Sequence, residues 1–133
     1  MSGLFDKMNL KDQGEIVVLN APMSFEPELA ALKNVAVVRE TGKAKTIHFG
    51  LAFAVTQGEL DKVSQTFGKE AEGDAVLWFA YPKGSSRRYR CEFNRDSGWD
   101  VIRAAGFDSV CMVAIDEDWS ALRFRRVEFI KVK

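Results

Sequence analysis

The stretch SVCMVAIDEDWSALRFRRVEF, residues 109–129, holds two apolar segments separated by a short acidic turn. The first segment, 109–116, and the second, 120–129, have the length and composition of β-strands. Because only a few residues around Glu117 and Asp118 separate them, we expect the two strands to form an antiparallel hairpin. This hairpin ends the predicted sheet.

Four further strands are predicted before the hairpin. Their apolar residues run without the polar alternation of a half-exposed strand, and such runs are typical of parallel strands that are covered on both faces. The predicted strands are EIVVLNAP (15–22), VAVVRE (35–40), HFGLAFAV (48–55) and AVLWFAY (75–81).

Helices are predicted between the strands. Thr56 and Glu59 form a T-x-x-E capping box that precedes an apolar helical face. Ser24 is predicted to cap a helix that runs to Lys33. A short amphipathic segment is also expected over residues 4–10.

One more helix is predicted before the hairpin. Asp96 or Ser97 is expected to cap it, and Gly106 to end it.

Strands that alternate with helices predict one α/β domain over residues 1–133, with a three-layer Rossmann-like architecture. We expect a mostly parallel six-stranded sheet in the order 2-1-3-4-6-5, with strand 6 antiparallel. The link over residues 40–47 is short for a crossover, so strand 3 pairing antiparallel with strand 2 remains the alternative.

Four segments, KMNLKDQGEIVVLNAP, LWFAYPKGSS, NRDSGWD and AIDEDWSALRFR, together resemble a family of small bacterial proteins of unknown function. The YPK-x-SS and WSALRFR segments are the most specific part of that resemblance. It implies the same fold and no substrate.

A parallel sheet that ends in an antiparallel hairpin also resembles the Rossmann-like fold of methyltransferases. Those enzymes place a Gly-rich turn after strand 1, where the backbone approaches S-adenosylmethionine. Here residues 20–24 read Asn-Ala-Pro-Met-Ser, without glycine and with a proline that lacks an N–H. Glu40, after strand 2, stands where an acidic residue holds the cofactor's ribose.

Composition excludes several classes of protein. The 19 basic and 19 acidic residues cancel, which disfavours a general nucleic-acid partner. Residues 1–13 lack the pattern of a secretory signal, no apolar run is long enough to span a membrane, and two cysteines give no disulfide framework. We therefore expect a cytoplasmic location, with Cys111 in the core and Cys91 exposed.

The loop YPKGSSRRYRCEFNRDSGW, residues 81–99, is the most chemically suggestive stretch. It fails the P-loop pattern, because Lys83 precedes its only nearby glycine. A small anion-binding nest at residues 84–86 remains one interpretation, and a solvated basic loop is the other.

The carboxyl edge of the sheet is where ligands bind in open α/β folds. This edge should collect the loop after strand 4, the start of the next helix and the hairpin turn, with Asn20 and Ser24 on the far side. The candidate ligand-binding residues are Lys83, Ser85, Ser86, Arg95, Trp119, Ser120 and Arg123.

Two of these candidates have competing interpretations. Trp119 either stacks on a planar ligand or closes the hairpin against the core. Packing against the core is the favoured interpretation. Arg123 is expected either to reach the ligand site at the carboxyl edge, to face solvent, or to pair with an acidic neighbour. Pairing is the favoured interpretation. No catalytic residue, cofactor or metal site is predicted: His48 is a lone histidine, and a solvated turn accounts for Asp116, Glu117 and Asp118.

The sequence supports three functions, in order of preference. The first is a non-catalytic domain that binds a small anionic or nucleotide-like ligand at the carboxyl edge. The second is a protein-interaction module or homodimer whose basic 87–95 loop meets an acidic partner. The third is a divergent S-adenosylmethionine-dependent methyltransferase.

Overall fold

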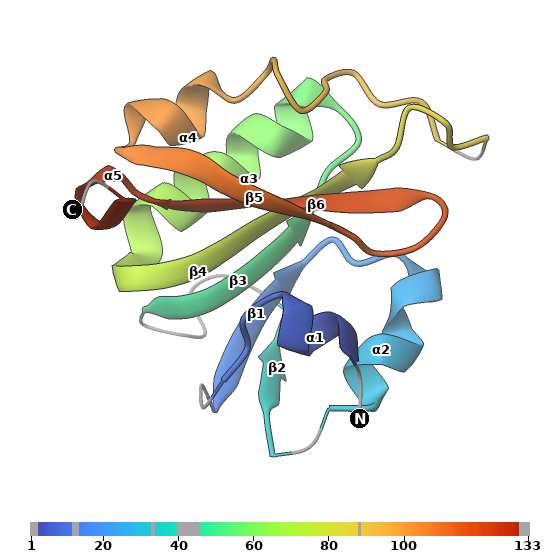
Figure 1. The fold of residues 1–133 in the computed structure, drawn as a ribbon, viewed down its shortest axis with the longest axis horizontal. Coiled ribbons are helices and arrows are strands. Elements are labelled where there is room, and N and C mark those ends of the chain that lie inside the picture. Colours follow the sequence, from blue (N-terminus) through green and yellow to red (C-terminus); the bar gives the residue numbers. More distant parts are fainter. Residues whose placement is uncertain (1–2, 12–13, 33, 40–45, 88, 131–133) are drawn as a thin grey trace.

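The computed structural model describes residues 3–11, 14–32, 34–39, 46–87 and 89–130. Its elements alternate between strands and helices up to a final hairpin (Figure 1). In chain order they are α1 (Gly3–Lys7), β1 (Glu15–Leu19), a 3-10 turn η1 (Met23–Phe25), α2 (Glu26–Ala30), β2 (Ala36–Val38), β3 (Ile47–Phe53), α3 (Gln57–Glu70), β4 (Ala71–Pro82), α4 (Asp100–Ala104), β5 (Phe107–Ala114), β6 (Trp119–Arg126) and α5 (Val127–Ile130).

The strands form one six-stranded sheet in the order β2-β1-β3-β4-β6-β5. The β1–β2, β1–β3 and β3–β4 pairs are parallel, whereas β6 pairs antiparallel with both β4 and β5. The predicted fold class and strand order are therefore confirmed. The alternative pairing of strand 3 with strand 2 is wrong, because β3 lies beside β1.

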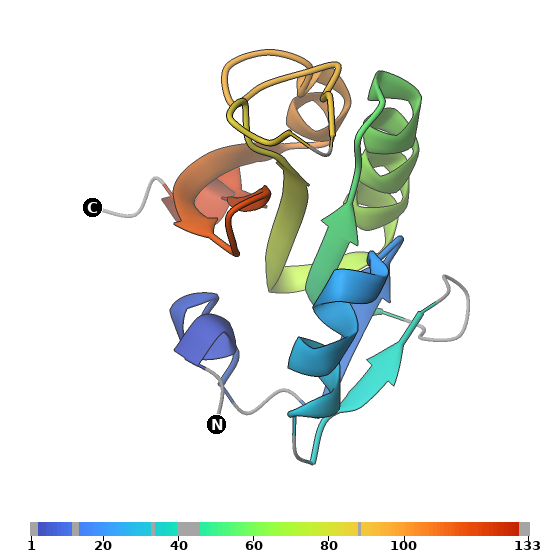
Figure 2. The same cartoon turned by 90° about the vertical axis from the view of Figure 1, so that its right-hand side faces the viewer.

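Helices cover both faces of the sheet, which gives three layers (Figures 1 and 2). One apolar cluster packs α3 and α4 against one face through side chains such as Phe67 and Ile102. The other packs α1, η1 and α2 against the opposite face through Phe5, Phe25 and Leu29. The central strands β3 and β4 contribute to both clusters, which explains their continuous apolar runs.

The α3 helix begins as predicted. Thr56 accepts a hydrogen bond from the Glu59 backbone N–H at 3.1 Å, and the Glu59 carboxylate accepts the Thr56 N–H at 3.1 Å. This capping box satisfies N–H groups that have no partner within the helix. It also fixes the turn that leaves β3 at the carboxyl edge.

Two other helix predictions are wrong in their bounds. Ser24 caps no helix through its side chain: it lies inside η1, and α2 covers only Glu26–Ala30. Likewise neither Asp96 nor Ser97 caps α4, which starts at Asp100. Pro22 precedes η1 and Pro27 lies in the first turn of α2, and both restrict the backbone there because proline fixes φ and has no N–H to donate.

The environments predicted for the cysteines are also wrong. Cys111 is exposed, because β5 is the edge strand and no layer covers its outer side. Cys91 is half-buried, and burial raises the pKa of its thiol. Strand 6 is shorter than predicted, since residues from Val127 onward form α5.

Within the described part of the chain, no helix has both the length and the apolar character needed to cross a membrane.

Candidate functional site at the carboxyl edge

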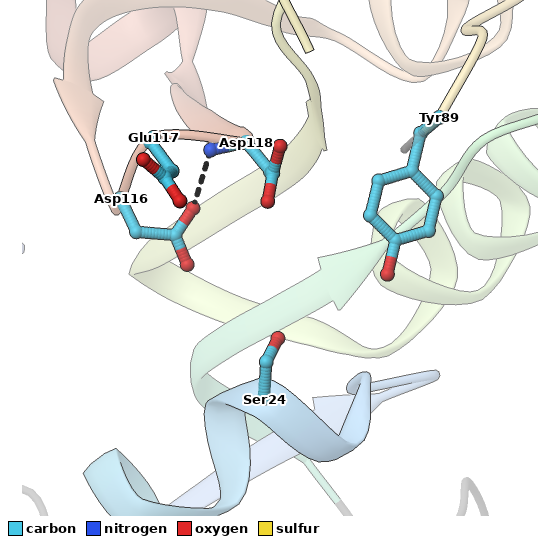
Figure 3. Close-up of a pocket in the computed structure, with 5 residues that line it drawn as sticks. All are labelled: Ser24, Tyr89, Asp116, Glu117 and Asp118. Atoms are coloured by element: carbon cyan, nitrogen blue, oxygen red, sulfur yellow. Dashed lines mark hydrogen bonds between the residues drawn. The ribbon is translucent and has the colours of Figure 1, made fainter. Parts of the chain in front are cut away.

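A pocket of about 370 Å³ opens at the carboxyl edge of the sheet (Figure 3). The η1 turn contributes Ser24, the loop after β4 contributes Tyr89, and the β5–β6 turn contributes Asp116, Glu117 and Asp118. The volume lies within the range of small-molecule sites, roughly 300–1,000 Å³. Segments far apart in sequence thus converge here, and three of the five lining side chains among the described residues are carboxylates.

The carboxylates stand on a tightly hydrogen-bonded turn. One oxygen of Asp116, Oδ1, accepts the backbone N–H groups of Asp118 at 2.8 Å and of Trp119 at 2.9 Å. The carbonyl of Trp119 in turn accepts the N–H of Ile115 at 2.9 Å. An Asx-type turn of this kind fixes the backbone that carries the acidic side chains. The pocket wall is therefore preformed.

The loop after β4 is bound to this acidic turn. The Lys83 N–H donates to the Asp118 carbonyl at 2.8 Å, and the Ser86 hydroxyl donates to Asp118 Oδ1 at 2.9 Å. The same hydroxyl oxygen accepts the Tyr89 N–H at 3.3 Å. Ser86 thus positions Tyr89 over the pocket by using a carboxylate of the protein itself.

A row of aromatic rings lies under the pocket and joins its walls. Phe25, next to Ser24, lies 5.0 Å from Phe53 of β3, measured between ring centroids. Phe53 lies 5.1 Å from Trp119, and Trp119 lies 4.9 Å from Tyr89. These tilted and edge-to-face contacts are the arrangements that aromatic pairs prefer. The row connects η1, the sheet, the acidic turn and the loop.

Trp119 is buried, as the favoured interpretation predicted, and also supports the pocket. Its side chain is 3% exposed, and its indole Nε1 is buried without a hydrogen-bond partner in the described structure. Buried donors almost always have partners. Trp119 is not among the described residues that line the pocket, so it supports the pocket through its ring contacts.

The turn after β1 adopts a left-handed backbone without glycine. Asn20 has φ of 62° and donates its side-chain amide to the Phe53 carbonyl at 3.2 Å. Asparagine tolerates this region better than other non-glycine residues. The chain therefore makes the sharp exit from β1 with Asn20, although Pro22 removes one backbone N–H from the turn. Glu40 lies outside the described residues.

The amino terminus of α3 is occupied by the protein's own carboxylates. Glu59 accepts the Val55 N–H at 2.8 Å, and Glu92 accepts the Gln57 N–H at 2.9 Å. A helix amino terminus favours anions. These two glutamates fill that role internally, which leaves α3 a poor site for an anionic ligand.

The structure brings only part of the predicted site together. Lys83, Ser86 and Trp119 meet at the acidic turn, and Ser85 lies exposed on the same loop. Ser120 is buried within β6, where it pairs with Tyr81.

The two arginines of the predicted set lie elsewhere. Arg95 lines a separate hollow with Met112 and Leu122, on the face that α3 and α4 cover, and pairs with Asp96 at 3.4 Å. Arg123 lies on β6 opposite Trp78, and its buried Nε has no hydrogen-bond partner among the described residues. These two arginines therefore lie away from the pocket, and the charged side chains among its described lining residues are carboxylates.

Sequence reasoning did not select Tyr89 or the three acidic residues as ligand-binding residues. The run Asp116–Asp118 at the end of a strand was the available signal. Across the described ranges, no group of three His, Cys, Asp or Glu side chains is placed to hold a metal ion.

Solved structures with a similar fold include a SAM-dependent methyltransferase and proteins in complex with SAM. A SAM-dependent methyltransferase from Aquifex aeolicus superimposes with a TM-score of 0.61 and 14% identity, covering 94% of this chain and 88% of that chain. The glycopeptide N-methyltransferase MtfA, complexed with (S)-adenosyl-L-methionine, superimposes with a TM-score of 0.60 and 8% identity, covering 93% of this chain and 92% of MtfA. LepI in complex with SAM gives 0.55 and 9%, covering 93% of this chain and 39% of LepI.

These identities are low, so the comparisons establish a methyltransferase-like Rossmann fold and leave activity open. This chain spans well under half of LepI. No family model and no curated protein sequence matches the chain.

Proposed function

We propose that this protein is a divergent S-adenosylmethionine-dependent methyltransferase that binds its cofactor in the carboxyl-edge pocket. The observation that carries the proposal is the acidic lining of that pocket, at the ligand-binding edge of a methyltransferase-like sheet. The first-ranked alternative, an anionic ligand, has less support because two of its predicted ligand-binding residues, Arg95 and Arg123, lie away from this pocket.

Charge complementarity favours this cofactor over an anion. S-adenosylmethionine has a positive sulfonium and a positive ammonium group, with one carboxylate. Asp116, Glu117 and Asp118 would hold the cationic groups, and the Tyr89 ring provides a π-face that attracts cations. The described lining of the pocket therefore complements the positive charges of the cofactor.

When bound, the cofactor supplies an electrophilic methyl group whose leaving group is a neutral thioether. The protein's own contribution is binding and orientation. The Asp116 turn fixes the carboxylates, and Ser86 fixes Tyr89 above them. Fixed groups of this kind preorganise a site, so little free energy is spent on ordering it when the ligand binds.

Binding is tested by isothermal titration calorimetry with S-adenosylmethionine and with its demethylated thioether product. S-adenosylmethionine and its thioether product differ by one positive charge, so a carboxylate that contacts the sulfonium, at about 0.2–1 kcal/mol for an exposed charge pair, should favour the sulfonium form by roughly 1.4- to 5-fold. Glu117→Gln should weaken binding of S-adenosylmethionine by about 2- to 5-fold and leave the thioether less affected. Glu72→Gln, the same charge change at the other end of the sheet, should change neither affinity.

Absence of binding at millimolar cofactor would refute the proposal. Equal affinity for the sulfonium and thioether forms would refute the role of the carboxylates. Production of the thioether in the presence of candidate acceptors distinguishes an enzyme from a binding domain, because a domain that only binds the cofactor gives no turnover with any acceptor.

A further inference from the structure

We propose that β5 is a self-association surface through which two copies of this chain pair edge to edge about a two-fold axis. This pairing does not require a ligand in the pocket. The composition of β5 is inconsistent with its position at the edge of the sheet.

The β5 strand has the composition of an interior strand but lies at the sheet edge. Val110 is 39% exposed and Met112 is 45% exposed, and Cys111 between them is exposed as well. In the described structure the other exposed large apolar side chains are Met23 and Val127, and Val127 begins α5, which contacts β5. Natural edge strands are usually short or carry charges that prevent pairing.

This edge has little such protection. No charged residue occurs between Asp108 and Asp116, and β5 runs for eight residues. Its one irregularity is the register shift between Ser109 and Cys111. The opposite edge, β2, has only three residues and is followed by Arg39. The unprotected edge of the sheet is therefore β5.

The charges at the two ends of β5 select a second copy as the occupant. Arg103 and Arg126 flank its amino end: Arg103 pairs with Asp108, and the Arg126 guanidinium lies 4.8 Å from the Phe107 ring centroid. The carboxyl end leads into the acidic turn at 116–118. An antiparallel copy places each acidic end beside a basic end, twice per dimer, whereas a parallel approach places like charges together.

The exposed apolar residues indicate the position of the axis. Cys111 lies at the middle of the exposed part of β5, so an axis at Cys111 places Val110 and Met112 on either side of it in both copies. A two-fold axis at Cys111 gives an isologous, closed dimer rather than a growing fibre.

The first test is the mass in solution, measured by light scattering after size exclusion at about 100 µM protein under reducing conditions. The expected result is twice the monomer mass. The Val110→Lys, Met112→Lys double variant should be a monomer with an unchanged far-UV spectrum, because both side chains are already exposed. Met23→Lys adds a charge at a residue that is 88% exposed and lies outside β5, in η1, and should stay dimeric.

The second test fixes the register. Residues directly opposite on antiparallel strands have Cα atoms about 4.5–5.5 Å apart, which suits a disulfide. Diamide, which takes up the two thiol hydrogens, should therefore link Cys111 to its counterpart and give a covalent dimer. Cys111→Ser should abolish the link and Cys91→Ser should keep it. A monomeric wild type, a dimer that survives both lysines, or a dimer without this link would each overturn the proposal.

Discussion

Two buried tryptophans allow a quantitative test of the unpaired indole under the pocket. Trp78 is 0% exposed and donates its Nε1–H to the Met8 carbonyl at 2.9 Å, whereas Trp119 is 3% exposed and its Nε1 has no partner in the described structure. Trp78→Phe and Trp119→Phe remove the same atoms from two apolar sites. The two substitutions differ in whether a hydrogen bond is lost.

The expected free energies differ accordingly. Complete truncation of a buried tryptophan to alanine costs about 3–5 kcal/mol, so the smaller change to phenylalanine should cost about 1–2 kcal/mol at each site. Trp78→Phe also leaves the Met8 carbonyl without its donor, which adds about 1–3 kcal/mol. Trp119→Phe loses no hydrogen bond, so it should be the milder substitution by that same amount.

Urea unfolding followed by far-UV circular dichroism measures both variants, because this signal does not depend on tryptophan emission. The comparison requires equal m-values, which show that the unfolded states are similarly exposed. If Trp119→Phe destabilises the protein as much as Trp78→Phe, the Trp119 indole is hydrogen-bonded in solution. That result would show that the Trp119 Nε1–H is not an unpaired donor.

Three further predictions concern the scaffold. Thr56→Ala removes the cap of α3 and should lower the free energy of unfolding by about 0.5–2 kcal/mol, with Thr56→Ser restoring most of it. Gly50→Ala places a Cβ 2.8 Å from the Phe67 ring and should cost about 1–3 kcal/mol in chemical denaturation. The hydrogen bond from Arg125 lowers the pKa of Asp74 from its ordinary value of 3.8. The Asp74 carboxylate therefore stabilises the folded protein above pH 3.8, and this stabilisation is lost as the pH falls through the lowered pKa. Asp74→Asn should therefore flatten the acid limb of a stability–pH curve slightly, and an unchanged limb would contradict this.

The sheet was predictable because the patterns that indicate it lie within short stretches of sequence or in the order of the elements. Continuous apolar runs in β1, β3 and β4 indicate strands buried on both faces, and the brief turn at Glu117 and Asp118 leaves no room for a parallel connection. Together with the alternation of strands and helices, these features give the order of the strands. The capping box at Thr56 and Glu59 is equally local, since its partners lie three residues apart.

The pocket was less predictable because it depends on which side chains pair within the protein. Ser86 was predicted to hold an anion, but its hydroxyl donates to Asp118 and its oxygen positions Tyr89. Arg95 lies on the other face because α4 starts at Asp100, later than the helix start expected near Asp96 or Ser97. Neither outcome can be obtained from spacing, since both depend on contacts between distant segments.

The exposure of Cys111 has a different origin. A run of apolar residues indicates a strand but does not say whether another layer or strand covers it. The predicted strand order already placed this strand at the edge of the sheet, so the exposure of Cys111 followed from the order and not from the composition of the strand.

The most direct test of the central claim is a two-dimensional NMR titration of the ¹⁵N-labelled protein with S-adenosylmethionine. If the cofactor binds in the carboxyl-edge pocket, the largest amide shifts are expected at Ser24, Tyr89 and residues 116–119, with little change at the amino edge around His48. Shifts concentrated at the amino edge, or no shifts at millimolar cofactor, would contradict it.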